Sequence, residues 1–327
     1  MGQISIKKHL YTSQVLGNLM ERMGQLPLLK KIHTISRLHI CGVIGQDTLD
    51  MHFAQLAPEV KNIFHKWEED DIEYIFNTYV LNIYESSKSY RRRNLSKVYS
   101  SMDVHYKKTM SIISTLEYVY LYSRWGKLCM IADVVPFMTK LIDDNATIIK
   151  NCLQYDRPKL KTIDGAMYIN SLFYIYHNID ILGIKNISKS FIYGLIKEAI
   201  DTYINYEGEL TEPIVYGITH ALIGPTKFYM DNNEYIKHSN EYDKLIEKLV
   251  EIVKSEQFGK FSLDLRIECC LVLKLYNASI DANYDFEKYM SKCGLLIDTR
   301  YRHISEVEDL EHTNILYVML NKICSII

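Results

Sequence analysis

The stretch SLDLRIECCLVLKL, residues 262–275, decides the fold class of this chain. Its apolar side chains recur every four residues, the spacing that lines one face of an α-helix, at Leu263, Ile267, Leu271 and Leu275. The same spacing recurs in other parts of the chain, for example over residues 16–23, 72–80 and 112–123. Only 6 Pro and 14 Gly punctuate the chain, and no Asn-Gly or Asp-Gly turn separates two alternating runs. The sequence therefore predicts an all-α protein.

We predict about twelve helices, near residues 5–23, 27–41, 49–65, 70–85, 103–124, 127–143, 163–182, 188–205, 213–223, 241–256, 262–277 and 311–326. The connections are mostly short, which favours antiparallel neighbours paired as about six hairpins. We therefore expect a single all-helical domain over residues 1–327, arranged as an α/α toroid. Pro136 should kink or split the helix at 127–143, and residues 86–101 and 224–240 are the expected long loops.

Composition and charge narrow the class of protein. The hydrophobic fraction of 48% and the charged fraction of 24% are ordinary for a soluble globular protein. A net charge of −2 gives no basic field to hold nucleic acid, and the short run Arg91-Arg92-Arg93 is interpreted as a solvated face. Near-neutral charge with this much apolar content leads us to expect a homodimer.

The cysteines and the chain start indicate a cellular compartment. The seven cysteines are odd in number and form no C-x-x-C pair, which disfavours a secreted disulfide framework. The first residues lack the apolar core of a signal peptide, and no apolar run reaches the ~18 residues of a membrane span. We expect a reduced, cytoplasmic protein with no membrane partner.

The segment Tyr216-Gly217-Ile218-Thr219-His220 places a histidine in an apolar helix. Gly217 costs such a helix about 1 kcal/mol against Ala, which indicates close backbone packing or a break. His220 is then either a core histidine bonded to a neighbouring turn or a side chain that lines a pocket.

The quoted stretch contains two acids four residues apart, Asp264 and Glu268, which share a helix face. Ser262 as N-cap explains Asp264, because an acid in the first turn complements the helix dipole. Glu268 lies among Cys269, Cys270 and leucines, and a buried Glu needs a partner. That partner belongs to a functional pocket, or it is an Arg, a Lys or a capping group.

His312 and Thr313 follow an acidic run suited to a helix start. In a helix over 311–326, His312 lies in the first turn, where the dipole favours the neutral imidazole that binds metal or acts as a base. The alternative is an exposed first-turn histidine. We predict that His220, Glu268 and His312 approach one pocket as acid–base groups or as zinc or iron ligands, with Asp264 as a supporting acid.

Other motifs are incomplete. Asp143-Asp144 is similar to the aspartate-rich metal motif of the all-helical terpene synthases, but it does not complete D-D-x-x-D. No P-loop, dinucleotide-binding glycine motif or nucleophile elbow occurs.

In their residues and their order along the chain, these segments resemble an uncharacterised family of bacterial all-helical proteins. That family has a Y-x-x-T-H segment, a D-x-x-x-E helix and a late H-T dipeptide. The fitting positions lie within residues 160–327 and are Tyr216, Thr219, His220, Asp264, Glu268, His312 and Thr313. The family is similar to the α/α toroids of lanthionine synthetases and terpenoid cyclases.

The resemblance implies an enzyme of bacterial specialised metabolism that acts on a peptide or small organic substrate. Residues 224–228 replace the T-D-F-G-like segment of that family, and the zinc-binding pattern of the lanthionine cyclases is absent, so cyclase chemistry is not implied. The alternatives are a non-catalytic helical scaffold that binds a peptide or protein partner, and a regulator with a small-molecule pocket.

Overall fold

A computed structural model describes residues 13, 15–21, 23–68, 72–77, 103–156, 165–229, 240–276 and 308–323. Within these ranges the regular elements are helices and no strand occurs, so the prediction of an all-α protein is confirmed. The chain divides into a middle unit, Asp50–Gly224, and a terminal unit formed by Met1–Leu49 with Pro225–Ile327. The single domain over residues 1–327 stays a prediction.

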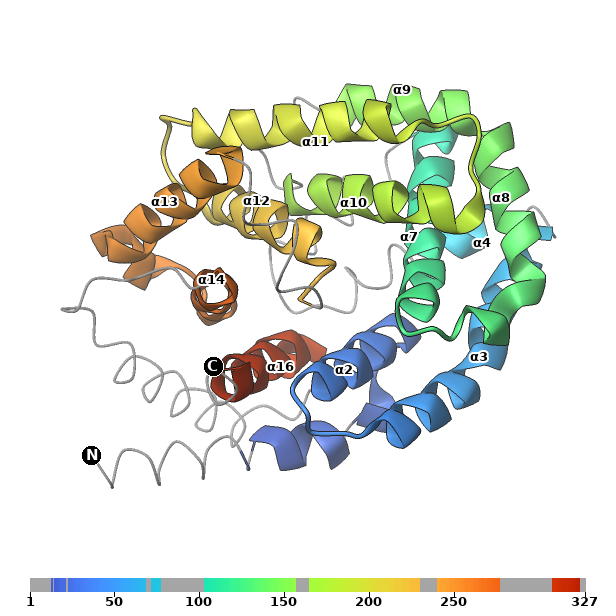
Figure 1. Cartoon of the computed structure of the whole chain (residues 1–327), viewed down its shortest axis with the longest axis horizontal. Helices are drawn as coiled ribbons and strands as arrows, with labels where there is room; N and C mark the ends of the chain where they lie inside the picture. Colours follow the sequence, from blue (N-terminus) through green and yellow to red (C-terminus); the bar gives the residue numbers. More distant parts are fainter. Residues whose placement is uncertain are drawn as a thin grey trace. The chain divides into compact units, whose positions relative to one another are not determined.

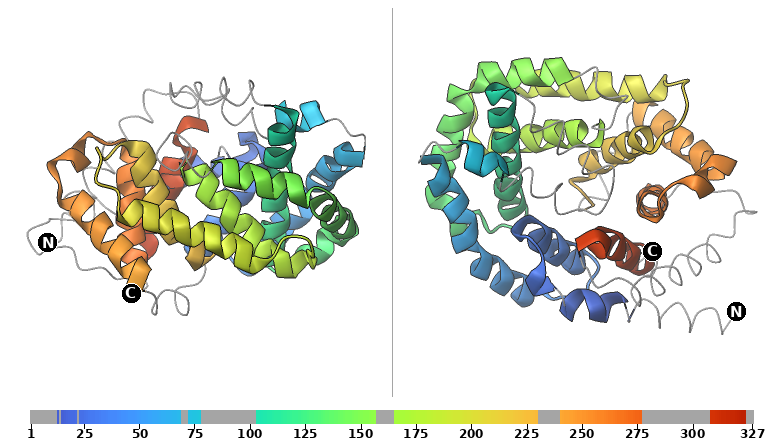
Figure 2. Two further views of the ribbon diagram at one scale, coloured as in Figure 1. Left: turned by 90° about the horizontal axis from the view of Figure 1, so that it is seen from above. Right: turned by 180° about the vertical axis from the view of Figure 1, so that it is seen from behind.

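The middle unit is built around α10. In chain order its elements are α3 (Gln46–Glu68, from Asp50 onward), α4 (Ile72–Ile75), α7 (Val104–Arg124), η3 (Leu128–Val134), α8 (Val135–Asp144), α9 (Ala146–Asp156), α10 (Gly165–Leu182), α11 (Lys189–Ile204) and α12 (Glu212–Ile223). Helix α10 packs against α7, α8, α11 and α12 (Figure 1; Figure 2).

Local sequence signals explain where the helices of the middle unit begin and end. Asp103 caps α7, because its Oδ1 accepts the backbone N–H groups of His105 and Tyr106 at 2.8 and 2.9 Å. Gly183 ends α10 with a left-handed φ of 64°, a conformation that glycine adopts without a Cβ clash. The sequence predicts this helix end, and the structure confirms it.

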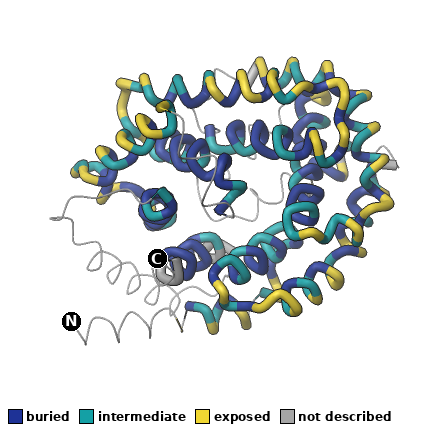
Figure 3. Tube along the Cα trace, viewed as in Figure 1, coloured by how far each residue is buried: buried dark blue, intermediate teal, exposed yellow. Residues whose placement is uncertain are grey.

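The terminal unit joins helices from both ends of the chain. Its elements are η1 (Met23–Gln25), α2 (Leu28–Ile40), the start of α3, α13 (Asn240–Lys254), η7 (Glu256–Lys260), α14 (Leu263–Leu275) and α16 (Glu308–Ile323). Helix α16 packs against both α14 and α2, and α14 also packs against α13. Figure 3 shows that α14 and α16 are buried over most of their described length, whereas α13 is exposed on one side. None of the described helices combines the length and apolar character of a membrane span.

The predicted helix ranges agree with the structure to within a few residues for most of the described chain, with one difference. The predicted split of the helix at 127–143 is confirmed, because the structure divides it into η3 and α8, with Pro136 in the first turn of α8, as its missing N–H allows. Helix α9 was not predicted. The loop expected at 86–101 lies outside the described residues, as does most of the one at 224–240, whose first residues form the short η5 (Gly224–Thr226) and a turn.

Gly217 lies inside α12 without breaking it. A Cβ built on Gly217 would stand 2.1 Å from the hydroxyl oxygen of Tyr203 on α11, far closer than van der Waals contact. Of the two explanations that the sequence allowed for this glycine, the structure supports close packing.

Candidate active site

The terminal unit brings Asp264 and His312 into direct contact. They lie on α14 and α16, two helices that pack side by side. His312 Nδ1 is 2.9 Å from Asp264 Oδ1, and 28% and 21% of the two side chains are exposed. The pair is therefore partly shielded from water and still reachable by a ligand.

Thr313 adds a second donor to the same carboxylate oxygen. Its hydroxyl donates to Asp264 Oδ1 at 2.9 Å, and the residue is buried. Because an ionised carboxylate only accepts hydrogen bonds, the neutral form of His312 carries its proton on Nδ1 and has its lone pair on Nε2. A carboxylate orients the imidazole in this way both in histidines that act as general bases and in histidines that bind metals.

The position of His312 in its helix corrects one prediction. Helix α16 begins at Glu308, so His312 is beyond the first turn, where the dipole effect has fallen off. The predicted first-turn histidine is therefore wrong. The neighbour that orients this imidazole is Asp264. Ser262 is the N-cap residue of α14, as predicted, but its side chain makes no capping hydrogen bond.

Glu268 lies one helical turn after Asp264 and is 1% exposed, which confirms the burial predicted from its apolar neighbours. Its charge acts on Tyr229, whose ring lies 6.0 Å from the guanidinium carbon of Arg37. Burial raises the pKa of Tyr229 well above its usual value; Glu268 and Asp264 raise it further, and Arg37 lowers it. Arg37, Tyr229, Glu268 and Asp264 thus belong to one electrostatic neighbourhood in the terminal unit.

Tyr229 reaches this neighbourhood through a strained backbone segment. Lys227, Phe228 and Tyr229 have φ values of 48°, 54° and 76°, a region that costs about 1–2 kcal/mol for each residue with a Cβ. The buried Thr226 stabilises the turn by accepting the Tyr229 N–H on its hydroxyl at 2.9 Å. Because strained residues gather at functional sites, we include Tyr229 in the candidate site.

His220 lies in the middle unit. Its Nδ1 is 2.7 Å from Asn170 Oδ1, so α12 and α10 are joined at this point. His177 of α10 makes a second contact nearby, because its Nε2 is 3.2 Å from the carbonyl oxygen of Gly224, the residue that follows α12. A helix-packing role explains both contacts, and the pocket role of His220 stays a prediction.

The predicted metal set of His220, Glu268 and His312 draws on both units, so its convergence also stays a prediction. Within the part of the chain that the structure describes, no three His, Cys, Asp or Glu side chains gather closely enough to hold a metal ion. Burial raises the pKa of the Cys269 thiol well above its usual value, and the nearby Cys270 and Glu268 add to this effect. This burial disfavours the thiolate, which is the form that binds metals.

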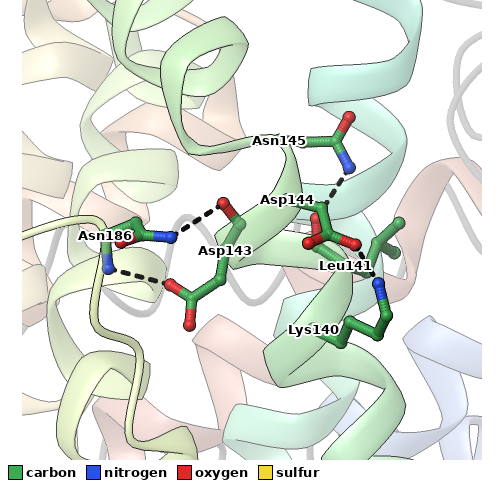
Figure 4. Close-up of polar contacts among 6 residues, drawn as sticks. All are labelled: Lys140, Leu141, Asp143, Asp144, Asn145 and Asn186. Carbon is green, nitrogen blue, oxygen red and sulfur yellow. Dashed lines mark hydrogen bonds and ion pairs between the residues drawn. The ribbon is translucent and has the colours of Figure 1, made fainter.

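The pair Asp143-Asp144 has a structural role. Asp143 Oδ1 accepts the backbone N–H groups of Lys185 and Asn186 at 3.0 and 2.8 Å. These contacts, of which Figure 4 shows the one with Asn186, tie the end of α8 to the connection after α10. Asp144 pairs with Lys140 one turn earlier in α8. These contacts explain both aspartates without the metal motif of a terpene synthase.

Sequence reasoning missed two residues of the terminal-unit site, Arg37 and Tyr229. Arg37 lies in an ordinary amphipathic helix, and Tyr229 is one of 26 tyrosines. The one available signal was Gly224-Pro225-Thr226, which marks a turn just before Tyr229. Comparisons with known protein families, with curated proteins and with solved structures found no match.

Proposed function

We propose that this protein is an enzyme in which His312 acts as the general base and Asp264 orients it. The observation that carries the proposal is the 2.9 Å contact between His312 Nδ1 and Asp264 Oδ1, reinforced by Thr313. It supports a proton acceptor at Nε2 in a partly shielded site, where acid–base catalysis contributes about 10²–10⁴-fold to rate.

The reaction class that fits these groups best is hydrolysis of an acyl bond. His312 Nε2 takes a proton from a water molecule while the water oxygen forms a bond to the substrate carbonyl carbon. The imidazolium then returns the proton to the leaving group as the bond between carbon and leaving group breaks. Asp264 stabilises the imidazolium, and Glu268, one turn away, is the proposed carboxylate partner of the site.

The resemblance noted in the sequence supports a peptide or small organic substrate and a place in bacterial specialised metabolism. It also supports closure of the helices as an α/α toroid. A small-angle scattering profile tests this closure, because a toroid and an open solenoid of equal length differ in radius of gyration.

Hydrolysis of p-nitrophenyl esters of increasing acyl length and of amino-acid p-nitroanilides tests the proposal. The wild type should release p-nitrophenol or p-nitroaniline faster than buffer, and H312Q should be slower than wild type by about 10²-fold or more. H105Q is the matched control, because His105 is an exposed histidine of α7 in the middle unit. Equal rates for wild type and H312Q would contradict the proposal and favour the non-catalytic scaffold.

Elemental analysis distinguishes a general-base role of His312 from a role as a metal ligand. Protein purified without chelator or a nickel column should contain stoichiometric zinc or iron if His220, Glu268 and His312 form a metal site, and each single replacement should reduce the metal content. Ester hydrolysis that depends on His312 in metal-free protein would favour the general base alone.

A further inference from the structure

Arg37 brings a positive charge into the neighbourhood of the His312–Asp264 pair. It lies in α2, and its guanidinium carbon is 6.0 Å from the centroid of the buried Tyr229 ring. Helix α16, which contains His312, packs against both α2 and α14. The charges of Arg37, Glu268 and Asp264 all act on Tyr229. The guanidinium therefore belongs to the same part of the terminal unit as the proposed base.

The guanidinium of Arg37 has no ion pair among the side chains that the structure describes, a set that leaves out the side chains of residues 308–311 in α16. Asp264, a nearby acid, already accepts hydrogen bonds from His312 and Thr313. A guanidinium beside an aromatic ring keeps the N–H donors at its edge available for hydrogen bonds. Because Arg37 is half-buried, an anion that reaches it gains more than it would at an open surface.

We propose that Arg37 binds a carboxylate group of the substrate, so that the site takes peptides or small organic acids with a free carboxylate. This inference rests on the proposed function, because it assigns the substrate class to the same site. The fork of N–H donors on one arginine matches the two oxygens of one planar carboxylate. A phosphate dianion fits less well, because Asp264 and Glu268 repel its second negative charge.

The rival explanation is that Arg37 only neutralises the buried Glu268. The two explanations differ in one measurable respect. A counterion for Glu268 does not distinguish a carboxylate ligand from its amide, whereas a substrate-binding arginine does.

The experiment uses the full chain with ¹³C-labelled histidine and follows the C2–H resonance of His312, which H312Q identifies by its absence. The probes are N-acetyl-L-phenylalanine and N-acetyl-L-phenylalaninamide, which differ only at the carboxyl group. The carboxylate should shift the His312 resonance with a dissociation constant on the order of 1 mM, as expected for a ligand of this size. The amide should leave the resonance unchanged.

Variants of α2 complete the test. R37Q should weaken carboxylate binding by about tenfold or more. The dissociation constant of R37K should lie between those of the wild type and R37Q, because lysine keeps the positive charge but lacks the fork of N–H donors. K31Q removes one positive charge from the same helix and should bind as the wild type does. If R37Q does not fold, the comparison of R37K with K31Q decides the question, because both keep a side chain of similar length.

Three outcomes overturn the proposal: equal binding of carboxylate and amide, no carboxylate-dependent shift, or unchanged binding in R37Q and R37K. Failure of the proposed function is a separate result. Carboxylate binding that depends on Arg37, without ester or anilide hydrolysis that depends on His312, supports this inference and rejects the general base. Hydrolysis that depends on His312, together with carboxylate binding that does not depend on Arg37, supports the general base and rejects this inference.

Discussion

Asp264 is the acceptor for two side chains of α16, so its removal should destabilise the protein measurably. D264A leaves the His312 Nδ1–H and the buried Thr313 hydroxyl without their acceptor. The free energy of unfolding should fall by about 1–3 kcal/mol, measured by urea denaturation. D243A is the matched control, because Asp243 is an exposed acid in the first turn of α13. It should lose only the dipole contribution of about 0.3–1 kcal/mol. Equal losses in D264A and D243A would show that the contact with α16 adds nothing.

Tyr120 provides a pH-dependent prediction in the middle unit. Burial in α7 raises its pKa to about 12, while Arg124 lowers it and Glu117 raises it slightly further. Because the folded-state pKa exceeds the unfolded value, the stabilising contribution of Tyr120 is complete below pH 10. It is lost as the pH rises through about 12. An ultraviolet titration of wild type minus Y120F should show this late ionisation, and R124M should delay it further. Ionisation of Tyr120 near pH 10 in the folded protein would contradict the prediction.

At the scale of single residues, the sequence predicted those whose role depends on their own helix. Glu268 is predictable as buried because its neighbours along α14 are apolar. The contact between Asp264 and His312 joins helices that are distant in the chain, so the sequence could only nominate both residues. Arg37 carries no local signal, and Tyr229 has only the turn marked by Gly224-Pro225-Thr226, because the roles of both residues arise from packing between α2 and the segment that follows η5.

At the scale of helices, the two glycines of α11 and α12 offer opposite predictions. Gly217 in α12 has no room for a Cβ, which would stand 2.1 Å from the Tyr203 hydroxyl. G217A should therefore lower the free energy of unfolding by about 1–3 kcal/mol through overpacking. Gly194 is an exposed residue inside α11, and a Cβ there meets no atom within 4 Å. G194A should raise the free energy of unfolding by up to about 1 kcal/mol, because alanine favours the helix.

Thermal or urea denaturation of both variants checks these signs. Comparing G217A with G194A removes the higher helix propensity of alanine from the result, because it stabilises the helix at both positions. A stabilised G217A would mean that Tyr203 moves aside without cost, and close packing would no longer explain this glycine.

Helix α9 shows why periodicity alone missed one element. Its buried apolar residues, Ala146, Ile149 and Leu153, stand at helical spacing, but they are few and the segment is short. Its stability comes from packing against α7 and α8, which a local pattern does not encode. By contrast, α10 and α14 have apolar residues on most sides and were predicted to within a few residues. Sequence periodicity therefore locates the buried helices of this protein better than its short peripheral ones.

At the scale of the whole molecule, the predicted single domain leads to a test of cooperativity. Continuous helical backbone crosses between the two units twice, within α3 at Leu49–Asp50 and within η5 at Gly224–Pro225. Unfolding of one unit must fray a helix that the other shares, so we expect one cooperative transition. The two tryptophans, Trp67 and Trp125, both lie in the middle unit, whereas circular dichroism reports the helices of both units.

Urea denaturation followed by both signals should therefore give coincident midpoints. The decisive variant is D264A, which weakens a contact inside the terminal unit only. In a single cooperative domain, D264A lowers the midpoint of tryptophan fluorescence as much as that of circular dichroism, although both tryptophans lie in the other unit. G217A makes the converse perturbation in the middle unit and should also move both signals together. A D264A protein that unfolds in two steps, with its fluorescence transition at the wild-type midpoint, would identify two independently folding domains, because the loss of one terminal-unit contact would then leave the middle unit as stable as before.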